Sequence, residues 1–457
     1  MHKVTVNGKT AYAADGTLLS DVLMKSGDSV SHPCGGKGIC KKCLVTVNGK
    51  EELSCRYIIK DDINVTVFKE EDGITDEKVV LKDVTCLALD IGTTTLALAA
   101  VSLDDGRIIK AVTRDNPQRS FGADVISRIE YCRQNGITQL HKALICEINS
   151  MISEFALAKR AKLYASGNVT MLHTLFGIDC SSLGESPYTP AFLESKTVMA
   201  EEIGIKGVEV VCSLPSISAF VGADIVSGMG FIGRPKRGRH SLLLDLGTNA
   251  EIVLTGEESS LCTAAAAGPC FEGANISCGM SATSGAIYSY SKKEIGTINN
   301  APAKGICGTG LIDVVAYLIS ENYVDKTGFM EEGSVEIADG VRIDQKDIRQ
   351  YQLAKSAVCS AILTLMQLKN VSFDDIDKVY VSGGFSVKIN IDNAVSTGLI
   401  PKELASKCVS LNNSSLLGTA KYAAEQTDLS YITDKAKYID LSDNETFADL
   451  FIKNMAL

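Results

Sequence analysis

The chain has 457 residues, of which 45% are apolar and 22% charged. This is the composition of a globular protein, and it excludes a mostly disordered or collagen-like chain. The formal net charge of −10 argues against a general nucleic-acid binder, which would carry a basic surplus. The sequence contains neither an apolar run long enough to span a membrane nor the apolar core of a secretory signal at its start. We therefore expect a soluble cytoplasmic protein.

Cysteine usage is the next guide. There are 15 cysteines, an odd number in a long chain without a secretory signal, so a disulfide framework is not expected. Four of them, Cys34, Cys40, Cys43 and Cys55, fall within 22 residues. The other eleven are scattered, and we expect most of them, such as Cys146, Cys212 and Cys359, to lie on apolar faces as small hydrophobic residues.

Residues 1–70 are predicted to form a small β-rich domain. Alternating segments at 3–8 and 9–14 indicate a hairpin, and residues 17–27 indicate a helix with Thr17 as its N-cap and Gly27 as its stop. Two further strands are expected in LVTVNG (44–49) and NVTVF (64–68). This order of strands, helix and cysteine loop is that of a β-grasp ferredoxin.

The cysteine loop has the spacing C-x5-C-x2-C-x11-C, from Cys34 through Cys40 and Cys43 to Cys55. Four thiolates can hold a 2Fe–2S cluster, and plant-type ferredoxins use a similar C-x4-C-x2-C run with a distant fourth cysteine. The neighbouring glycines would let backbone N–H groups donate to the cluster sulfurs. A structural zinc site is the alternative, although zinc ribbons usually have two C-x2-C pairs and this loop has one.

Residues 71–83 are rich in charged residues and contain no aromatic side chain, so we expect a linker there. The chain then changes character. VTCLALDIGTTTLALAAV (84–101) is an apolar strand, a Gly/Thr turn and a second apolar strand, and SLLLDLGTNAEIVLTG (241–256) repeats this pattern about 155 residues later. In each copy an aspartate ends the first strand, at Asp90 and at Asp245. The sequence therefore predicts an internal duplication.

The duplicated turns have the chemistry of a phosphate site. Glycine turns let backbone N–H groups face phosphate oxygens, hydroxyl groups add donors, and aspartates can hold Mg²⁺. A third segment, VYVSGGFS (379–386), is an apolar strand that ends in two glycines, where a nucleoside could lie. The predicted nucleotide-binding residues are Gly92, Thr93, Thr94, Gly247, Thr248, Asn249, Gly308, Gly383 and Gly384. Two ordinary hairpins remain the alternative.

In this order, the three segments resemble the actin, sugar-kinase and heat-shock-chaperone ATPase superfamily. The resemblance implies an α/β fold in which two ribonuclease-H-like subdomains, here residues 84–240 and 241–457, close over ATP. Sugar kinases place a catalytic aspartate near the position of Asp224, so Asp90, Asp224 and Asp245 are the candidate catalytic carboxylates. A capping role for Asp224 is nearly as well supported, and Asp124 is a weaker candidate for a mirror role.

Other reactive side chains have simpler interpretations. His173 is expected to be a core or surface histidine. A second metal site built from Cys270, Cys278 and Cys307 is not favoured, because no pair has C-x2-C spacing. Gly308 and its neighbouring glycines are expected to pack a helix start near the nucleotide.

The combination of the two parts is distinctive. A ferredoxin fused to this ATPase fold resembles the reductive activators of corrinoid-dependent methyltransferases. The segments that carry the resemblance are NPQRSFGADVISRI, LDIGTTT, LDLGTNAEI, AAGPCFEGANISCGM, GICGTGLID and VSGGF. It covers nearly the whole chain but departs in length, since members often carry an additional domain between the ferredoxin and the ATPase.

The resemblance implies an ATP-dependent electron transfer from the 2Fe–2S cluster to the cobalt(II) of a corrinoid protein, which restores cobalt(I) for methyl transfer. The implied cofactors are the cluster, ATP and Mg²⁺. The implied partners are the corrinoid protein and a low-potential donor such as a ferredoxin or flavodoxin, with no nucleic acid or membrane partner. Monomer and homodimer both stay open. The alternative function is a redox-sensing kinase or ATP-binding scaffold in which the cluster is regulatory.

Overall fold

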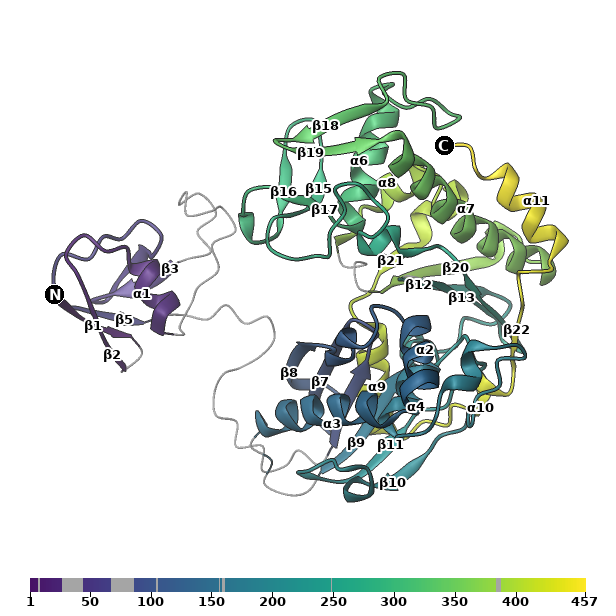
Figure 1. Ribbon diagram of the computed structural model, residues 1–457, viewed down its shortest axis with the longest axis horizontal. Helices are drawn as coiled ribbons and strands as arrows, with labels where there is room; N and C mark the ends of the chain where they lie inside the picture. The colour runs from purple at the N-terminus through teal and green to yellow at the C-terminus, as the bar shows by residue number, and fades with distance from the viewer. Residues whose placement is uncertain are drawn as a thin grey trace.

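The computed structural model describes residues 1–6, 9–26, 44–66, 86–103, 106–155, 157, 161–247, 249–383 and 388–457. Two lobes, each built on a six-stranded sheet, make up residues 86–457 (Figure 1). A separate five-stranded sheet is formed by the N-terminal residues. In the part of the chain that the structure describes, no helix is both long and apolar enough to cross a membrane.

The N-terminal domain is a mixed sheet with strand order β2-β1-β5-β3-β4 and one helix. Strands β1 and β5 are parallel, and the other pairs are antiparallel. Alternate residues, such as Val4 and Val6 in β1, point into the core because successive side chains of a strand face opposite sides. The elements are β1 (His2–Val6), β2 (Lys9–Ala13), α1 (Leu19–Ser26), β3 (Leu44–Val47), β4 (Lys50–Leu53) and β5 (Ile63–Thr66).

This architecture confirms the small β-rich domain and the predicted strands, with two corrections. Helix α1 begins at Leu19, and Leu18 pairs with Ile58 in an isolated bridge, so Thr17 does not immediately precede the helix. The short charged strand β4 was not predicted, because its sequence KEEL has no alternating apolar pattern. Cys55 is buried just after β4. The other proposed ligands, Cys34, Cys40 and Cys43, lie outside the described residues, as does Gly27.

The first lobe contains a sheet of order β10-β11-β9-β6-β7-β8. The central strand β6, CLALDI, is apolar except for Asp90 near its end, because helices cover both faces of the sheet. The strands are β6 (Cys86–Ile91), β7 (Thr95–Val101), β8 (Ile108–Asp115), β9 (Ala161–Gly167), β10 (Thr197–Met199) and β11 (Val208–Ser213). The helices are η1 (Pro117–Ser120), α2 (Val125–Asn135), α3 (Thr138–Ser153), α4 (Val169–Leu175), η2 (Ser181–Gly184), η3 (Ala200–Ile203) and α5 (Ala223–Ile232).

The second lobe contains a sheet of order β21-β20-β12-β13-β14-β22. Its strands are β12 (His240–Leu246), β13 (Ala250–Thr255), β14 (Ser260–Ala265), β20 (Ile376–Ser382), β21 (Cys408–Ser410) and β22 (Ala436–Tyr438). Its smaller sheets comprise β15 (Ala286–Tyr290), β16 (Ile295–Thr297), β17 (Gly305–Ile306), β18 (Ser334–Ala338) and β19 (Val341–Asp344). The helices are η4 (Pro269–Glu272), η5 (Ile298–Asn300), α6 (Gly308–Ser320), α7 (Gln345–Leu368), η6 (Phe373–Asp375), α8 (Ile391–Ser396), η8 (Lys402–Lys407), α9 (Ser414–Glu425), α10 (Ser430–Thr433) and α11 (Glu445–Lys453).

The two large sheets repeat one topology, which confirms the predicted duplication. Strands β11, β9, β6, β7 and β8 of the first lobe correspond in order and direction to β21, β20, β12, β13 and β14 of the second. Each sheet adds one strand, β10 or β22, on opposite edges. The fold is therefore the actin- and hexokinase-like α/β fold expected from the sequence.

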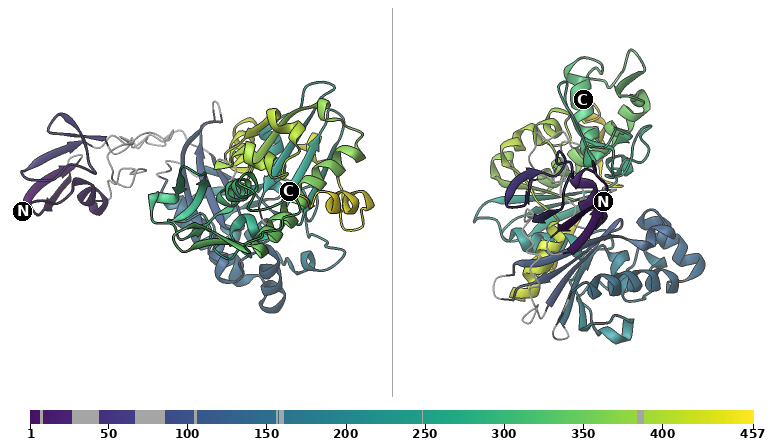
Figure 2. Two further views of the ribbon diagram at one scale, coloured as in Figure 1. Left: turned by 90° about the horizontal axis from the view of Figure 1, so that it is seen from above. Right: turned by 90° about the vertical axis from the view of Figure 1, so that its left-hand side faces the viewer.

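One helix that follows most of the second lobe in the sequence packs on the first lobe. Helix α9 comes from the C-terminal part of the chain but packs on β6, β7 and β9 of the first sheet and on α5 (Figures 1 and 2). Its apolar residues Leu416, Ala420 and Ala423 join the core of the first lobe. Helix α5 leads from the first lobe into β12, and α9 returns from the second lobe, so the pair forms the connection between the lobes.

Candidate nucleotide site

Two aspartates end equivalent strands of the two sheets. Asp90 is the second-last residue of β6, and Asp245 is the second-last residue of β12. Each strand is followed by a tight turn, in which the N–H of Gly92 donates to the carbonyl of Thr95 and the N–H of Gly247 donates to the carbonyl of Asn249. The two predicted phosphate turns are thus present at corresponding places in the fold.

The strand beside each aspartate also repeats. Ser166 pairs with Asp90, and Ser382 pairs with Asp245. A glycine follows each serine, with φ of 155° at Gly167 and 109° at Gly383. A Cβ at Gly167 would lie 2.7 Å from the carbonyl oxygen of Ile91, and one at Gly383 would lie 2.3 Å from that of Leu246, so both strand ends require glycine.

The start of α9 joins the two aspartates. Asn413 Nδ2 and Ser415 Oγ each donate to the Asp90 carboxylate at 2.7 Å. The neighbouring Ser414 Oγ lies 2.7 Å from Ser382 Oγ, which is in turn hydrogen-bonded to the Asp245 carboxylate. One helix start therefore contacts a carboxylate in the first lobe directly and a carboxylate in the second lobe through one hydroxyl group.

Asp224 is brought to the same place by the connecting helix α5. It lies in the first turn of the helix, whose N-cap is Gly222, so Asp224 is not the capping residue. Burial raises the pKa of Asp224 to about 7, with Asp245 and Asp90 as further causes. Burial likewise raises the pKa of Asp245 to about 6, assisted by Asp90. The structure thus brings all three predicted aspartates together.

Sequence reasoning missed a fourth carboxylate, Glu251. It is the cross-strand partner of Asp245, in the segment LDLGTNAEI, whereas Ala97 is the partner of Asp90. Burial raises the pKa of Glu251 well above its ordinary value, and Asp245 and Asp224 add to this effect. The residue could have been found from the period of two along β13, which places it on the same side of the sheet as Asp245.

These carboxylates have the chemistry of a divalent-cation site. Burial also raises the pKa of Asp90, against the opposing hydrogen bonds from Ser415 and Asn413. Partly buried carboxylates that repel one another are stabilised by a cation between them, and Mg²⁺ prefers a few carboxylates combined with phosphate oxygens. No three acidic side chains of the described residues are placed to hold a metal ion by themselves, so these residues fit Mg²⁺ as one or two carboxylate ligands completed by phosphate oxygens.

The first turn rests on a buried polar network that the sequence did not predict. Asn116 Nδ2 donates to the carbonyl of Gly92 at 2.8 Å, and the Asn116 backbone N–H donates to that of Thr94 at 2.8 Å. Arg128 Nη2 donates to the carbonyl of Thr93 at 2.6 Å. Both side chains come from the segment NPQRSFGADVISRI, and Arg128 is fully buried.

The remaining predicted nucleotide-binding residues have these positions. Thr93 Oγ1 accepts from Asn168 Nδ2 at 3.1 Å, and Asn249 is exposed in the second turn. Helix α6 begins at Gly308, where a Cβ would lie 2.0 Å from the carbonyl oxygen of Phe271, so this glycine packs the helix start as expected. Thr248 and Gly384 lie outside the described residues.

Two weaker candidates have structural roles. Asp124 caps α2, where its carboxylate accepts from the N–H of Ser127 at 2.7 Å. His173 is buried, with Nδ1 2.7 Å from the carbonyl of Val169 and Nε2 accepting from the N–H of Ala191 at 3.0 Å. Of the two expected places for His173, core or surface, the structure shows the core.

The scattered cysteines do not form a second metal site. Among the described residues, no group of three or more histidine, cysteine or acidic side chains could hold a metal ion. Cys307 Sγ donates to the carbonyl of Ile287, and Cys278 Sγ accepts from the N–H of Arg342. Cys359 is buried as expected, but Cys146 is exposed, which corrects its assignment to an apolar face.

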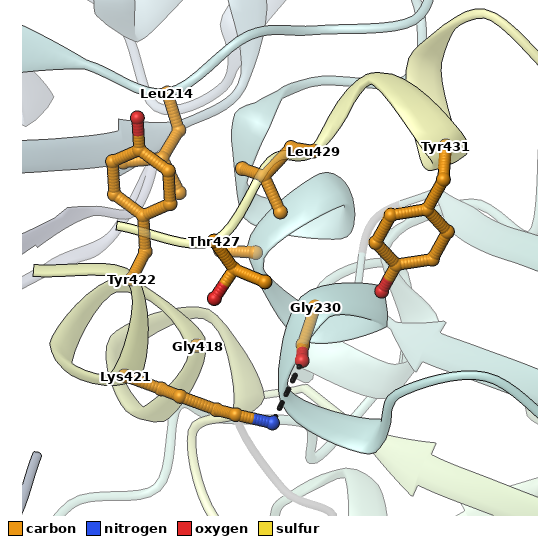
Figure 3. Close-up of a pocket in the computed structure, with 9 residues that line it drawn as sticks. Leu214, Gly230, Gly418, Lys421, Tyr422, Thr427, Leu429 and Tyr431 are labelled. Carbon is orange, nitrogen blue, oxygen red and sulfur yellow. Dashed lines mark hydrogen bonds between the residues drawn. The ribbon is translucent and has the colours of Figure 1, made fainter. Parts of the chain in front are cut away.

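Figure 3 shows a small pocket between α5 and α9. Its lining includes Ser227 and Gly230 of α5, the helix that also carries Asp224. Lys421 of α9 crosses the pocket, and its Nζ donates to the carbonyl of Gly230 in α5 at 3.3 Å. The pocket is lined by Leu214, Ser227, Gly230, Gly418, Lys421, Tyr422, Thr427, Leu429 and Tyr431. The pocket lies at the connection between the lobes. It is beside α5, which carries Asp224, and α9, whose start donates hydrogen bonds to Asp90.

Comparison with known families identifies the family to which both lobes belong. Residues 85–234 match the RACo middle region, and residues 239–457 match the C-terminal domain of RACo, the ASKHA domain. The chain belongs to the RACo family of reductive activators of corrinoid proteins. The ASKHA domain is the ATPase fold shared with actin and hexokinase, and in this chain it carries Asp245, Glu251 and the start of α9.

Relatives of this RACo-family chain are diverged in sequence but similar in extent. The corrinoid activation enzyme RamQ of Eubacterium limosum is 24% identical over 96% of each chain. That alignment runs over 570 positions, more than this chain has residues, so the relative carries insertions. The [Co(II) methylated amine-specific corrinoid protein] reductase of Methanosarcina barkeri is 25% identical over 80% of this chain and 76% of its own length.

A solved structure, a reductive activator for corrinoid, iron-sulfur protein, superposes with a TM-score of 0.71 at 25% identity. The match covers 100% of this chain and 98% of that chain. The family resemblance predicted from the sequence is therefore confirmed, together with its fold.

Proposed function

We propose that this RACo-family chain transfers one electron to the cobalt(II) of a corrinoid protein and uses ATP to make that transfer favourable. The observation that carries the proposal is the duplicated turn with its converging carboxylates, fused to a domain with four closely spaced cysteines. The names of relatives that align over 80% or more of this chain support the same reaction.

The electron-carrying part is the N-terminal domain. Cys34, Cys40, Cys43 and Cys55 are the proposed ligands of a 2Fe–2S cluster, which when bound supplies a one-electron carrier. Cys55 contributes a thiol that is held inside the domain, beside the start of α1. The overall reaction is balanced as one electron gained by cobalt(II), giving cobalt(I), and one electron supplied to the chain by a low-potential ferredoxin or flavodoxin.

Energy is needed because a plant-type cluster has a potential near −400 mV, which we take to be too high for cobalt(II) reduction. An assumed shortfall of about 0.2 V corresponds to roughly 4.6 kcal/mol for one electron. Nucleotide binding can supply this by favouring one conformation of the activator and corrinoid protein over another.

The site residues have distinct proposed roles in this cycle. The turns at Gly92–Thr94 and Gly247–Asn249 bind phosphate oxygens through backbone N–H groups. Asp90, Asp224 and Asp245 hold Mg²⁺ or orient the attacking water, and the hydrogen bonds from α9 oppose the rise that burial causes in the pKa of Asp90. Because α5 and α9 connect the lobes and carry site residues, a change in how the lobes close would be transmitted through these two helices.

The test is reduction of a cobalt(II) corrinoid protein by the anaerobically prepared, dithionite-reduced chain, followed by the absorption of cobalt(I). We expect cobalt(I) to accumulate with Mg·ATP and not without nucleotide. Equal reduction in both conditions would contradict the coupling. Sugars and other alcohols should not be phosphorylated, and phosphorylation of one would favour the kinase alternative.

The cluster assignment is tested separately by the Cys43→Ser variant. We expect it to lose iron and visible absorption while it binds ATP with the affinity of the unchanged protein. An iron-free, zinc-containing wild-type chain after oxygen-free preparation would overturn the 2Fe–2S assignment.

A further inference from the structure

A buried arginine lies behind the first turn. Arg128 is fully buried, and its hydrogen-bond partners among the described residues are all neutral. Nη2 donates to the carbonyl of Thr93 at 2.6 Å and Nε donates to that of Gly122 at 2.9 Å. Nη1 lies 3.4 Å from both Gln118 Oε1 and Met171 Sδ.

No carboxylate forms an ion pair with Arg128 within the described part of the chain. The nearest acidic influence is Asp124, but its carboxylate is used to cap α2 through Ser127. Arg119 adds a second positive charge nearby. Burial lowers the pKa of Arg128 to about 10, which still leaves the guanidinium charged at neutral pH. Asp124 attracts Arg128 only at longer range and forms no ion pair with it, so the buried charge is incompletely compensated and an anion bound nearby would stabilise it.

The turn itself shows where that anion belongs. The carbonyl groups of Gly92, Thr93 and Thr94 all accept hydrogen bonds from Asn116 or Arg128, so they point into the buried network. In a trans peptide the N–H of the next residue points the opposite way. The N–H groups of Thr93 and Thr94 therefore point away from Asn116 and Arg128, where a ligand could accept hydrogen bonds from them.

We propose that Arg128 is a positioning residue that makes the first turn selective for the polyphosphate group of the nucleotide. It orients the turn through the Thr93 carbonyl, and its charge attracts phosphate oxygens bound on the other side of the same peptide groups. This inference rests on the proposed nucleotide site. It goes beyond that site because the attraction is assigned to a side chain that does not touch the ligand.

The proposal predicts how affinity depends on the number of phosphates. At an effective dielectric constant of about 20, the attraction between two unit charges separated by several ångströms corresponds to on the order of a tenfold to hundredfold change in affinity. The effect grows with ligand charge, so it is largest for ATP, smaller for ADP and absent for adenosine. If Arg128 only supported the fold, its substitution would lower the affinities for all three ligands by the same factor.

The experiment is isothermal titration of the full chain with ATP, ADP and adenosine at fixed ionic strength. Arg128→Met is expected to lower ATP affinity about 10- to 100-fold, ADP affinity less, and adenosine affinity not at all. Arg128→Lys keeps the charge and is expected to recover part of the loss. The matched control is Arg133→Met on the same helix, an exposed arginine paired with Glu130 and Glu185, which should change none of the affinities.

The proposal would be overturned if Arg128→Met lowered the affinities for ATP and adenosine by the same factor, or if it left the ATP affinity unchanged. If Arg128→Met does not fold, Arg128→Lys decides, because an equal loss for ATP and adenosine there has the same meaning. A wild-type chain that binds no nucleotide would instead refute the nucleotide site itself, and with it this inference.

Discussion

The two lobes share a topology, an aspartate and a tight turn, yet they differ in the charges around those features. In the first lobe, Asp90 faces Ala97 across the strand pair, and the turn is backed by the buried Arg128. In the second lobe, Asp245 faces Glu251 across the equivalent pair. The duplicated backbone is therefore conserved within the molecule, while the side chains have diverged toward opposite charges.

This difference suggests a division of labour. A turn backed by a positive charge favours phosphate oxygens, and a pair of neighbouring carboxylates favours a divalent cation. Asp224, on the helix that connects the lobes, lies within electrostatic range of both Asp90 and Asp245. We therefore infer that the first lobe mainly binds the phosphates and the second mainly binds Mg²⁺, so that the complete ligand holds the lobes together.

The largest expected effect comes from Asp245→Asn. Removal of this carboxylate should lower ATP-dependent cobalt(II) reduction by more than about 100-fold, because it takes away a central cation ligand. Iron content and the visible spectrum should stay unchanged. The control is Asp449→Asn, an exposed position on α11. Normal reduction by Asp245→Asn would show that the second lobe does not hold the cation.

The next effect is on stability. The pKa values of Asp224 and Asp245 are raised in the folded chain to about 7 and about 6. The folded state therefore binds more protons than the unfolded state between pH 4 and pH 7. Stability of the nucleotide-free chain should be fully present near pH 4 and fall as pH rises through 6 to 7, by a few kcal/mol in total.

This is measured by denaturant unfolding across pH. The decrease of the unfolding free energy with rising pH should become smaller in Asp224→Asn. It should disappear with saturating Mg·ATP, because the cation compensates the ionised carboxylates. A pH-independent stability of the nucleotide-free protein would mean that the carboxylates are farther apart in solution than in the structure.

A smaller effect is expected from Glu251→Gln, which makes the second lobe more like the first. It should weaken Mg²⁺ binding about tenfold, since one carboxylate is lost. The nucleotide-free chain should become more stable by about 1 kcal/mol, because a buried repulsion is removed. Mg²⁺ titrations and thermal unfolding measure the two effects, with Glu209→Gln on the exposed side of β11 as the control. Weaker Mg²⁺ binding without stabilisation would indicate that Glu251 is not strained before the cation binds.

The smallest effect is expected from Ser415→Ala, which removes one of the two hydrogen bonds from α9 to Asp90. One hydrogen bond to a charged group is worth about 1.5–3 kcal/mol, and Asn413 keeps part of the orientation, so ATP hydrolysis should fall severalfold. The pH optimum should move upward, because Asp90 loses a group that lowers its pKa. Ser442→Ala, on an exposed turn, is the control. A lower rate at an unchanged pH optimum would assign Ser415 a structural role only.

Much of this organisation could be predicted from the sequence. The repeat of Asp90 and Asp245 within similar apolar strands is a local pattern, and strand ends in such a fold meet at one edge of the sheet. The packing of Gly308 at a helix start also followed from local sequence, whereas for His173 the sequence left core and surface both open. Strand lengths, turns and the family resemblance all depend on residues close together in the chain, which is why they were predictable.

The rest depends on contacts between distant residues. Arg128 lies 35 positions after Thr93, and Asn413 lies 323 positions after Asp90. Nothing near Asn413 in the sequence indicates that α9 returns to the first lobe. Glu251 was overlooked because its importance comes from pairing with Asp245 rather than from a motif. The exposed side chain of Cys146 shows that an apolar surrounding sequence does not by itself fix burial.

The division between the lobes is tested most directly by titrating ATP, with and without Mg²⁺, into the wild-type chain, Arg128→Met and Asp245→Asn. Arg128→Met is predicted to lose affinity for ATP whether or not Mg²⁺ is present. Asp245→Asn is predicted to lose only the part of the affinity that Mg²⁺ adds. Loss of the same Mg²⁺-dependent part in both variants would contradict the account.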